Sequence, residues 1–291
     1  MYKESGIKKV KPYILLAPFL LLYMLFTIFP VLKGIQMSFY DWNLFRKMEF
    51  VGLKNYERMI NDHFFWDSIW NTTFFVMIST PVMIVIALAL ALLANVNSKL
   101  KTLYRSAFFL PSILSVSVIS YVAVFVVQPY TGLLSTGLNV FGIEREFFFQ
   151  QDPVLVWVFI TGTTLWWTVG FNMILYLSAL QDIPKHLYEA ADIDGAARWT
   201  KFRYITLPLL KPITFVILLL QILASYKVFA QIFLMTGGGP GTETRPIIQY
   251  IYETGFVKNN LGYSAAMSYG LFIILVLVTV IQFKVTRKRG G

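Results

Sequence analysis

The 291-residue chain contains no cysteine and only two histidines, His63 and His186. Without cysteine there is no disulfide, no thiolate nucleophile and no iron–sulfur or cysteine-zinc site. Two histidines far apart in the sequence also disfavour a histidine-rich metal site. We therefore predict a non-catalytic chain that binds no metal or cofactor of its own.

Charged residues are also scarce, at 14% of the chain, whereas 57% of its residues are hydrophobic. An ordinary soluble domain carries about 25% charged residues, so this composition favours a membrane protein. The formal net charge of +10 can suggest nucleic acid as a partner. The basic residues, however, form short clusters between long apolar runs, as membrane topology requires, and we expect the partner surface to be the lipid bilayer.

Long apolar runs are what the sequence has in abundance, and a helix needs about 20 such residues to cross a bilayer. We predict an all-α integral membrane protein, a single transmembrane domain over 1–291, with about six helices near 13–36, 70–94, 107–128, 155–179, 210–234 and 263–284. The first run lacks a small-residue cleavage site and is expected to be a retained anchor. The third carries a serine stripe suited to close helix packing: Ser112, Ser115, Ser117 and Ser120.

The positions of the lysines and arginines predict the orientation of these helices. Sixteen of the 25 fall on the side of the N-terminus and eight on the other, with Lys227 inside a span. Since basic residues accumulate in cytoplasmic segments, both termini and the loop 182–208 are expected inside the cell. The expected outer loops are 38–69, 129–153 and 235–262.

The cytoplasmic loop 182–208 reads as two short helices between long spans. Pro184 suits the first turn of a helix, and Gly195 can adopt the left-handed conformation that ends one. One face of this helix is mostly small, with Leu187, Ala190, Ala191 and Asp194. Such a low, flat face can lie close against another surface, so the loop is a candidate docking element for a cytosolic partner.

This loop resembles the EAA loop of bacterial ABC importer permeases of the carbohydrate-uptake branch, the maltose and glycerol-3-phosphate type. The resemblance rests on the segment Tyr188, Glu189, Ala190, Ala191, Asp192, Ile193, Asp194, Gly195 and Ala196, followed by Phe202 and Leu207-Pro208. The segment from Phe50 to Tyr56 is similar to the first-permease, maltose-F-like member of such pairs.

The resemblance implies a type I ABC importer permease fold in the bacterial cytoplasmic membrane. It also implies the partners: a homologous sister permease, two ABC ATPase subunits that use ATP and magnesium, and an extracytoplasmic solute-binding protein. The loop would be the coupling helix, with Tyr188, Glu189, Ala190, Ala191, Asp194, Gly195 and Ala196 contacting an ATPase subunit. Glu189 would take polar contacts there and Gly195 the turn.

A glycine run follows the fifth predicted span, from Thr236 to Gly241. It is no phosphate-binding loop, because that motif needs Gly-Lys-Ser/Thr and here Thr242-Glu243 follow. The resemblance implies an outer loop that contacts the binding protein through Gly237, Gly238, Gly239 and Pro240. A plain turn is the equally weighted alternative.

Polar side chains on the fourth and fifth spans are candidates for a substrate pathway, since lone polar groups are costly in lipid. The fourth span offers Thr163, Thr164, Trp166, Trp167, Asn172 and Tyr176, and the fifth Gln221, Ser225, Tyr226, Lys227 and Gln231. Amides and aromatic rings together suit neutral carbohydrate. The resemblance also implies substrate contacts near 166–172 and 224–228. We predict the pathway at Trp166, Trp167, Asn172, Ser225, Tyr226 and Lys227.

Two of these predictions have open alternatives. Trp166 and Trp167 can equally form an interfacial belt or pack between helices. Lys227 can snorkel outward in a structural or gating role, which we favour, or it can bind a sugar or attract an anionic substrate.

Taken with the resemblance, the sequence predicts the permease subunit of an ATP-driven importer for a sugar or related polyol. One alternative is an ABC permease for another small solute, such as a peptide or amino acid. A second, of a different class, is a membrane-embedded enzyme or assembly factor. An enzyme would need acid, base or nucleophile clusters inside the bilayer, and Lys227 is the only charged residue in a span core.

Overall fold

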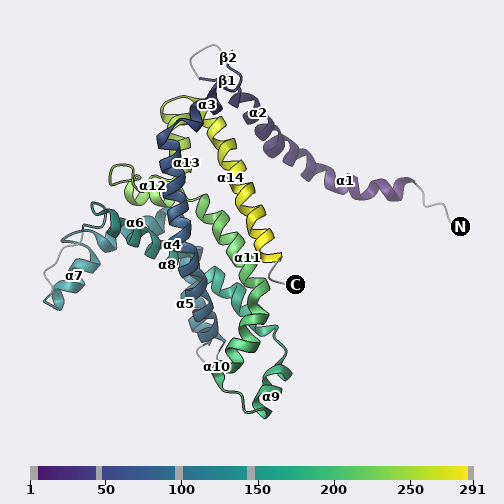
Figure 1. Cartoon of the computed structure of the whole chain (residues 1–291), viewed down its shortest axis with the longest axis vertical. Coiled ribbons are helices and arrows are strands. Elements are labelled where there is room, and N and C mark those ends of the chain that lie inside the picture. The colour runs from purple at the N-terminus through teal and green to yellow at the C-terminus, as the bar shows by residue number, and fades with distance from the viewer. Residues whose placement is uncertain (1–5, 44–47, 96–100, 143–147, 288–291) are drawn as a thin grey trace. The chain divides into compact units, whose positions relative to one another are not determined.

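Helices form most of the computed structural model, which describes residues 6–43, 48–95, 101–142 and 148–287 (Figure 1). Five of these helices are long and apolar enough to cross a membrane, or six if one strongly bent pair is a single span. The prediction of an all-α membrane protein with about six spans is confirmed. The residues divide into two units, 1–65 with 251–273 and 66–250 with 274–291, which are described in turn.

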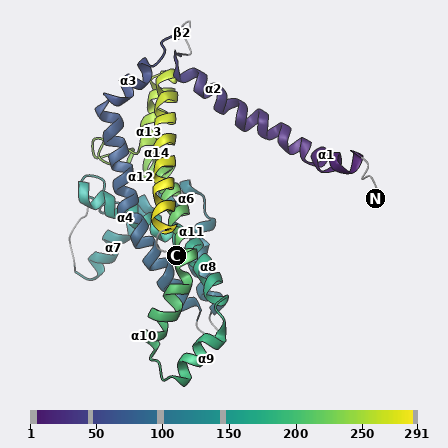
Figure 2. The same ribbon diagram turned by 45° about the vertical axis from the view of Figure 1, so that its right-hand side comes forward.

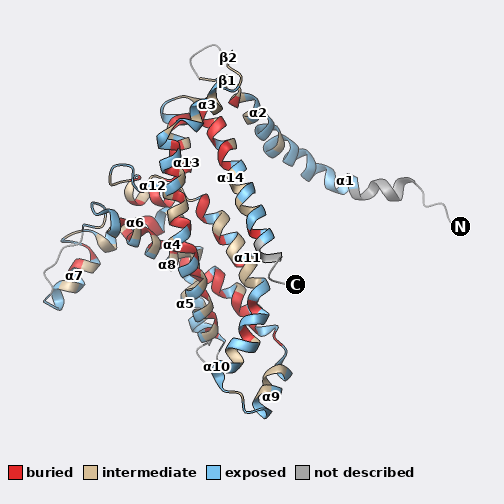
Figure 3. Cartoon of the chain, in the orientation of Figure 1, coloured by how far each residue is buried: buried red, intermediate tan, exposed pale blue. Residues whose placement is uncertain are grey.

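The first unit begins with a long apolar helix that widens into a π-helical turn. Its elements are α1 (Gly6–Tyr23), η1 (Met24–Ile28), α2 (Phe29–Ser38), β1 (Tyr40–Asp41), β2 (Glu49–Phe50), α3 (Lys54–Ile60), η3 (Glu253–Val257) and the start of α14 (Leu261–Arg287). The π turn ends at Ile28, two residues before Pro30, which has no N–H to donate to the preceding turn. The two strands pair antiparallel, Tyr40 opposite Phe50. Within Leu15–Ser38, the most apolar stretch of 18 residues has no buried residue (Figure 3), whereas Ser38 at the end of α2 is fully buried.

Hydrogen bonds hold the remaining parts of this unit together. The Asn55 amide donates to the carbonyls of Ser38 and Tyr40, at 2.9 and 3.0 Å, and so fixes α3 to the end of α2. On α14, the Tyr263 hydroxyl donates to the carboxylate of Asp62. These polar contacts order the residues that the sequence assigned to an outer loop.

The second unit holds the helices that position the candidate site. They are α4 (His63–Ala94), which begins in the first unit, α5 (Lys101–Ile113), α6 (Val116–Val127), α7 (Leu133–Val140), α8 (Pro153–Gln181), α9 (Lys185–Ile193), α10 (Arg198–Lys201), η2 (Phe202–Thr206), α11 (Leu207–Tyr226), α12 (Ala230–Thr236) and α13 (Ile247–Tyr252). Its core joins α4, α8 and α11, with Met83, Met173 and Ile217 fully buried. In Figures 1 and 2, α9 and α10 lie at one end of this unit and α13 lies toward the other.

Helices α5 and α8 approach closely at a glycine. A Cβ atom on Gly170 would lie 2.2 Å from the carbonyl oxygen of Phe108 and 2.7 Å from the Cα atom of Phe109. Small residues allow membrane helices to approach backbone to backbone. Gly170 therefore permits the crossing of α5 and α8.

Two predicted spans are broken, which corrects the sequence-based boundaries. Instead of one helix over 107–128, α5 ends at Ile113 and α6 begins at Val116, with a bend of 101°. Ser115 has an extended backbone and its side chain accepts from the Val118 N–H, so it caps α6 rather than packing in a stripe. Instead of one helix over 210–234, α11 ends at Tyr226 and α12 begins at Ala230. The other four predicted spans agree with helices in the structure.

Candidate functional site

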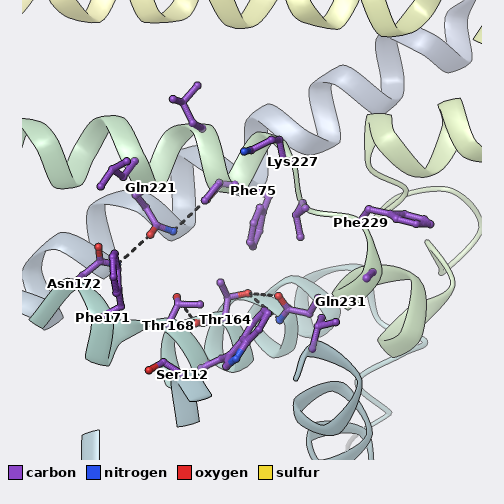
Figure 4. Close-up of a pocket in the computed structure, with 18 of the residues that line it drawn as sticks. Phe75, Ser112, Thr164, Thr168, Phe171, Asn172, Gln221, Lys227, Phe229 and Gln231 are labelled. Atoms are coloured by element: carbon purple, nitrogen blue, oxygen red, sulfur yellow. Dashed lines mark hydrogen bonds between the residues drawn. The ribbon is translucent and has the colours of Figure 1, made fainter. Parts of the chain in front are cut away.

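A cavity of about 810 Å³ lies in the second unit, lined by residues of α4, α5, α6, α8, α11 and α12 (Figure 4). Most of its lining is aromatic or aliphatic. Its neutral polar side chains are Ser112, Thr164, Thr168, Asn172, Gln221, Ser225 and Gln231. Apolar walls with a few convergent polar groups are typical of small-molecule sites of this size.

One hydrogen-bonded chain connects α8 to α11 across the cavity wall. The Asn172 amide donates to Gln221 Oε1 at 3.2 Å, and Gln221 Nε2 donates to Ser225 Oγ at 3.2 Å. All three side chains are buried. Because a buried amide has more donors and acceptors than these bonds use, the chain retains sites for a polar ligand.

A second contact connects α8 to α12, just beyond the break in the fifth predicted span. Gln231 Nε2 donates to Thr164 Oγ1 at 3.0 Å, and both residues are buried. Figure 4 shows this pair on the opposite side of the cavity from Lys227. The break after α11 therefore places Gln231 where a straight helix would not have directed it.

The bend between α5 and α6 is also linked to the cavity. Trp167 Nε1 donates to the carbonyl oxygen of Leu114 at 3.1 Å, which satisfies a backbone acceptor at the bend. Ser112, from the turn before it, donates to the Phe109 carbonyl at 2.6 Å and lines the cavity. A tryptophan of α8 thus fixes the corner that brings α5 and α6 to the site.

The predicted pathway residues divide into two groups. Four of them, Trp167, Asn172, Ser225 and Lys227, line the cavity together. Trp166 is half exposed and is not among the lining residues, and the Tyr226 hydroxyl lies 3.1 Å from Thr73 Oγ1 instead.

Sequence reasoning missed the lining residues Phe75, Phe109 and Phe229. No motif marks them, because an aromatic ring in an apolar run reads the same whether it faces lipid, core or cavity. Thr168 and Phe171 also line the cavity; they lie within the range 166–172 that the resemblance implied, but they were not named as candidates. Thr168 lies one turn from Thr164 and one turn from Asn172, so helical spacing was the available signal.

Lys227 is the one charged residue among the lining side chains that the structure describes. It directly follows Tyr226, the last residue of α11, and its side chain is exposed. Its backbone N–H donates to the Ala224 carbonyl, and that of Val228 donates to Ser225. The lysine therefore lies in the break between α11 and α12, beside the cavity.

The loop 182–208 is anchored on one face and exposed on the other. Leu187 and Tyr188 pack against the core, and the Tyr188 hydroxyl lies 2.9 Å from Thr206 Oγ1 at the start of α11. Lys201 forms an ion pair with Asp192, within the loop.

The outer face of α9 carries the residues that the sequence proposed for docking. Glu189, Ala190, Asp194 and Gly195 are exposed, and Ile193 is 87% exposed. Ala191 and Ala196 are partly buried. Gly195 has a φ of +70°, which confirms the left-handed turn, and a side chain there would be strained.

Hydrogen bonds brace the glycine run that follows α12. Thr244 Oγ1 donates to the Gly239 carbonyl at 2.6 Å, and Gln249 Nε2 donates to that of Gly237 at 2.8 Å. Gly238 is buried, Gly239 and Pro240 are partly buried, and Gly237 is exposed. The segment is thus an ordered turn with an exposed edge, a geometry compatible with both predicted roles.

Apolar helices of spanning length around a cavity with a few convergent polar side chains define a multi-pass membrane protein with a solute-sized site between its helices. Residues 57–289 match the family model described as binding-protein-dependent transport system inner membrane component. The chain belongs to this family.

Among curated proteins, the chain is 34% identical to the sulfoquinovosyl glycerol transport system permease protein of Agrobacterium fabrum, over 95% of this chain and 90% of that one. It is 33% identical to the arabinooligosaccharides transport system permease protein of Halalkalibacterium halodurans, over 96% and 88%.

Among solved structures, it resembles a chain of a bacterial alginate ABC transporter in complex with an alginate pentasaccharide-bound periplasmic protein. The TM-score is 0.87 at 26% identity, covering 98% of this chain and 96% of that one.

Proposed function

We propose that this chain is the membrane-spanning permease subunit of an ATP-driven importer for a sugar or related polyol. Its cavity forms half of the translocation pathway. The observation that carries the proposal is the cavity in which Asn172, Gln221 and Ser225 form a buried hydrogen-bonded chain from α8 to α11, in a chain of this transport family. The two curated relatives are named for the transport of sulfoquinovosyl glycerol and arabinooligosaccharides, which are glycosides or saccharides.

The lining of the cavity fits the chemistry of saccharides. Asn172 and Gln221 carry both donors and acceptors, as sugar hydroxyls require of their partners. The ring of Trp167 can pack against the apolar face of a pyranose. The charged amino group of a peptide would need a carboxylate as its partner. None of the described lining residues is an aspartate or glutamate, so the cavity fits a saccharide better than a peptide.

The exposed face of α9 is the proposed contact with an ATPase subunit. Since Tyr188 connects α9 to Thr206 at the base of α11, a push on the loop reaches a helix that lines the cavity. The glycine run lies toward the other end of the unit and is proposed to contact the solute-binding protein. A sister permease completes the pathway, and ATP and magnesium are used by the ATPase subunits.

The coupling is tested by replacing Glu189 with alanine in the reconstituted complex. We expect substrate-stimulated ATP hydrolysis to fall at least about tenfold, because a lost charged hydrogen bond at an interface costs about 1.5–3 kcal/mol. Glu57→Ala is the matched control, since Glu57 is an exposed glutamate on the short helix α3, within a predicted outer loop. Equal stimulation in both variants would refute the docking role of α9.

The pathway is tested by Asn172→Ala, which removes a bond to Gln221 inside the cavity. We expect sugar uptake into proteoliposomes to fall severalfold. Asn139→Ala changes an exposed asparagine of α7, outside the cavity, and should leave uptake as in the wild type. If Asn172→Ala transports at the wild-type rate, the cavity is not the pathway.

A further inference from the structure

The charge inside the cavity is of one sign. Lys227 is its only described charged lining residue, and the remaining polar lining consists of hydroxyls, amides and one indole N–H. Figure 4 shows Lys227 at the end of the helix that also carries Gln221. A solute in this cavity therefore meets neutral hydrogen-bonding groups along its length and a cation at one point.

No counter-charge for this lysine is found in the part of the chain that the structure describes. The ion pair found there joins Lys201 to Asp192, in the loop after α8. The carbonyls of Ala224 and Ser225, at the end of α11, already accept backbone N–H groups. Lys227 directly follows Tyr226, the last residue of an apolar span, and lines a cavity with mostly apolar walls. An ionised group in such surroundings is costly unless it has a partner or a function, so we expect a ligand that pairs with the ammonium group.

We infer that the cavity takes anionic saccharides, sugars that carry a carboxylate, sulfonate or phosphate group, and that Lys227 binds this group. The inference rests on the proposed function and narrows its substrate class. An ammonium is a compact point charge with three donors, which suits all three anions. Asn172, Gln221 and Thr168 then bind the hydroxyls of the same solute.

The substrate class is tested with matched saccharides on the reconstituted importer with its binding protein. The probes are cellobiose and glucosylglycerol, each beside its analogue with a carboxylate, a sulfonate or a phosphate at C6. We expect an anionic member to be taken up at least about tenfold better than its neutral parent, and the three arms identify the anion. A panel in which the neutral parents are the ones transported overturns the inference. Failure of every saccharide would instead count against the proposed function.

Lys227 itself is tested by Lys227→Gln, which keeps a hydrogen-bonding group and removes the charge. The binding protein is the same in each assay, so its own selectivity cancels. We expect the ratio of anionic to neutral uptake to fall about tenfold in Lys227→Gln and to be retained in Lys227→Arg. Lys54→Gln, which changes an exposed lysine of α3, should leave the ratio unchanged. A loss of anionic and neutral uptake by the same factor would indicate a gating role and overturn the inference.

Discussion

The close crossing of α5 and α8 predicts that Gly170→Ala destabilises the protein and distorts its cavity. The added Cβ atom would lie 2.2 Å from the Phe108 carbonyl oxygen, whereas ordinary contacts begin at 3.4 Å. The helices must therefore separate by about 1 Å, since backbone atoms cannot turn aside as a side chain can. Overpacking of this kind costs about 1–3 kcal/mol, and we expect the upper part of that range.

The same displacement reaches the site, because Phe109 and Ser112 line the cavity from α5 while Thr168 and Phe171 line it from α8. A wider gap between these two helices would weaken every contact that a solute makes with both walls at once. We therefore expect Gly170→Ala to lower uptake as well as stability, even though Gly170 does not line the cavity itself.

Gly162→Ala provides the matched control for this prediction. Gly162 lies on the same helix, and a Cβ atom there meets nothing within 4 Å. Alanine favours a helix over glycine by up to about 1 kcal/mol, so this variant should be as stable as the wild type or slightly more so. The measurement is the thermal unfolding midpoint of the purified complex in detergent, with uptake in parallel. Equal midpoints for the two variants would refute the close-crossing argument.

Two further predictions follow from single hydrogen bonds. Tyr188→Phe removes the contact between α9 and Thr206, so the importer should hydrolyse more ATP per solute transported. The measurement is the ratio of the ATP hydrolysis rate to the uptake rate in proteoliposomes, and an unchanged ratio would contradict the link between α9 and α11. Asp152→Ala removes the N-cap of α8, whose carboxylate accepts from the Val154 and Leu155 N–H groups at 2.8 and 2.9 Å. The free energy of unfolding should fall by about 1 kcal/mol, with Asp152→Asn close to the wild type, and a denaturation series that ranks the two variants alike would disprove the cap.

Hydropathy alone was sufficient to find the membrane helices, because a side chain that faces lipid and one that faces the core are both apolar. The span near 155–179 and α8 agree closely for this reason. The breaks at 114–115 and 227–229 were not predicted, since membrane helices tolerate prolines such as Pro111 without ending. Whether a helix breaks at such a point depends on residues far away in the sequence that can bind the freed backbone groups. Trp167, for example, donates a hydrogen bond to the carbonyl of Leu114 at the first break.

The site was partly predictable for a related reason. Asn172 and Ser225 could be found because a polar side chain in an apolar run is conspicuous by itself. Phe75 and Phe109 could not, because their place in the cavity depends on how α4 and α5 pack against α8. The EAA-like loop was the clearest sequence signal, and Gly195 has the backbone conformation expected of it.

The proposed docking of α9 on a cytosolic ATPase subunit can be tested directly with one introduced cysteine, because the chain has none of its own. A single cysteine at Ile193, a position that is 87% exposed, is cross-linked in native membranes with a short thiol-to-amine reagent. We expect an adduct with the ATPase subunit, and no labelling of intact cells by a membrane-impermeant maleimide. Labelling from outside, or the absence of an ATPase adduct, would contradict the proposed docking.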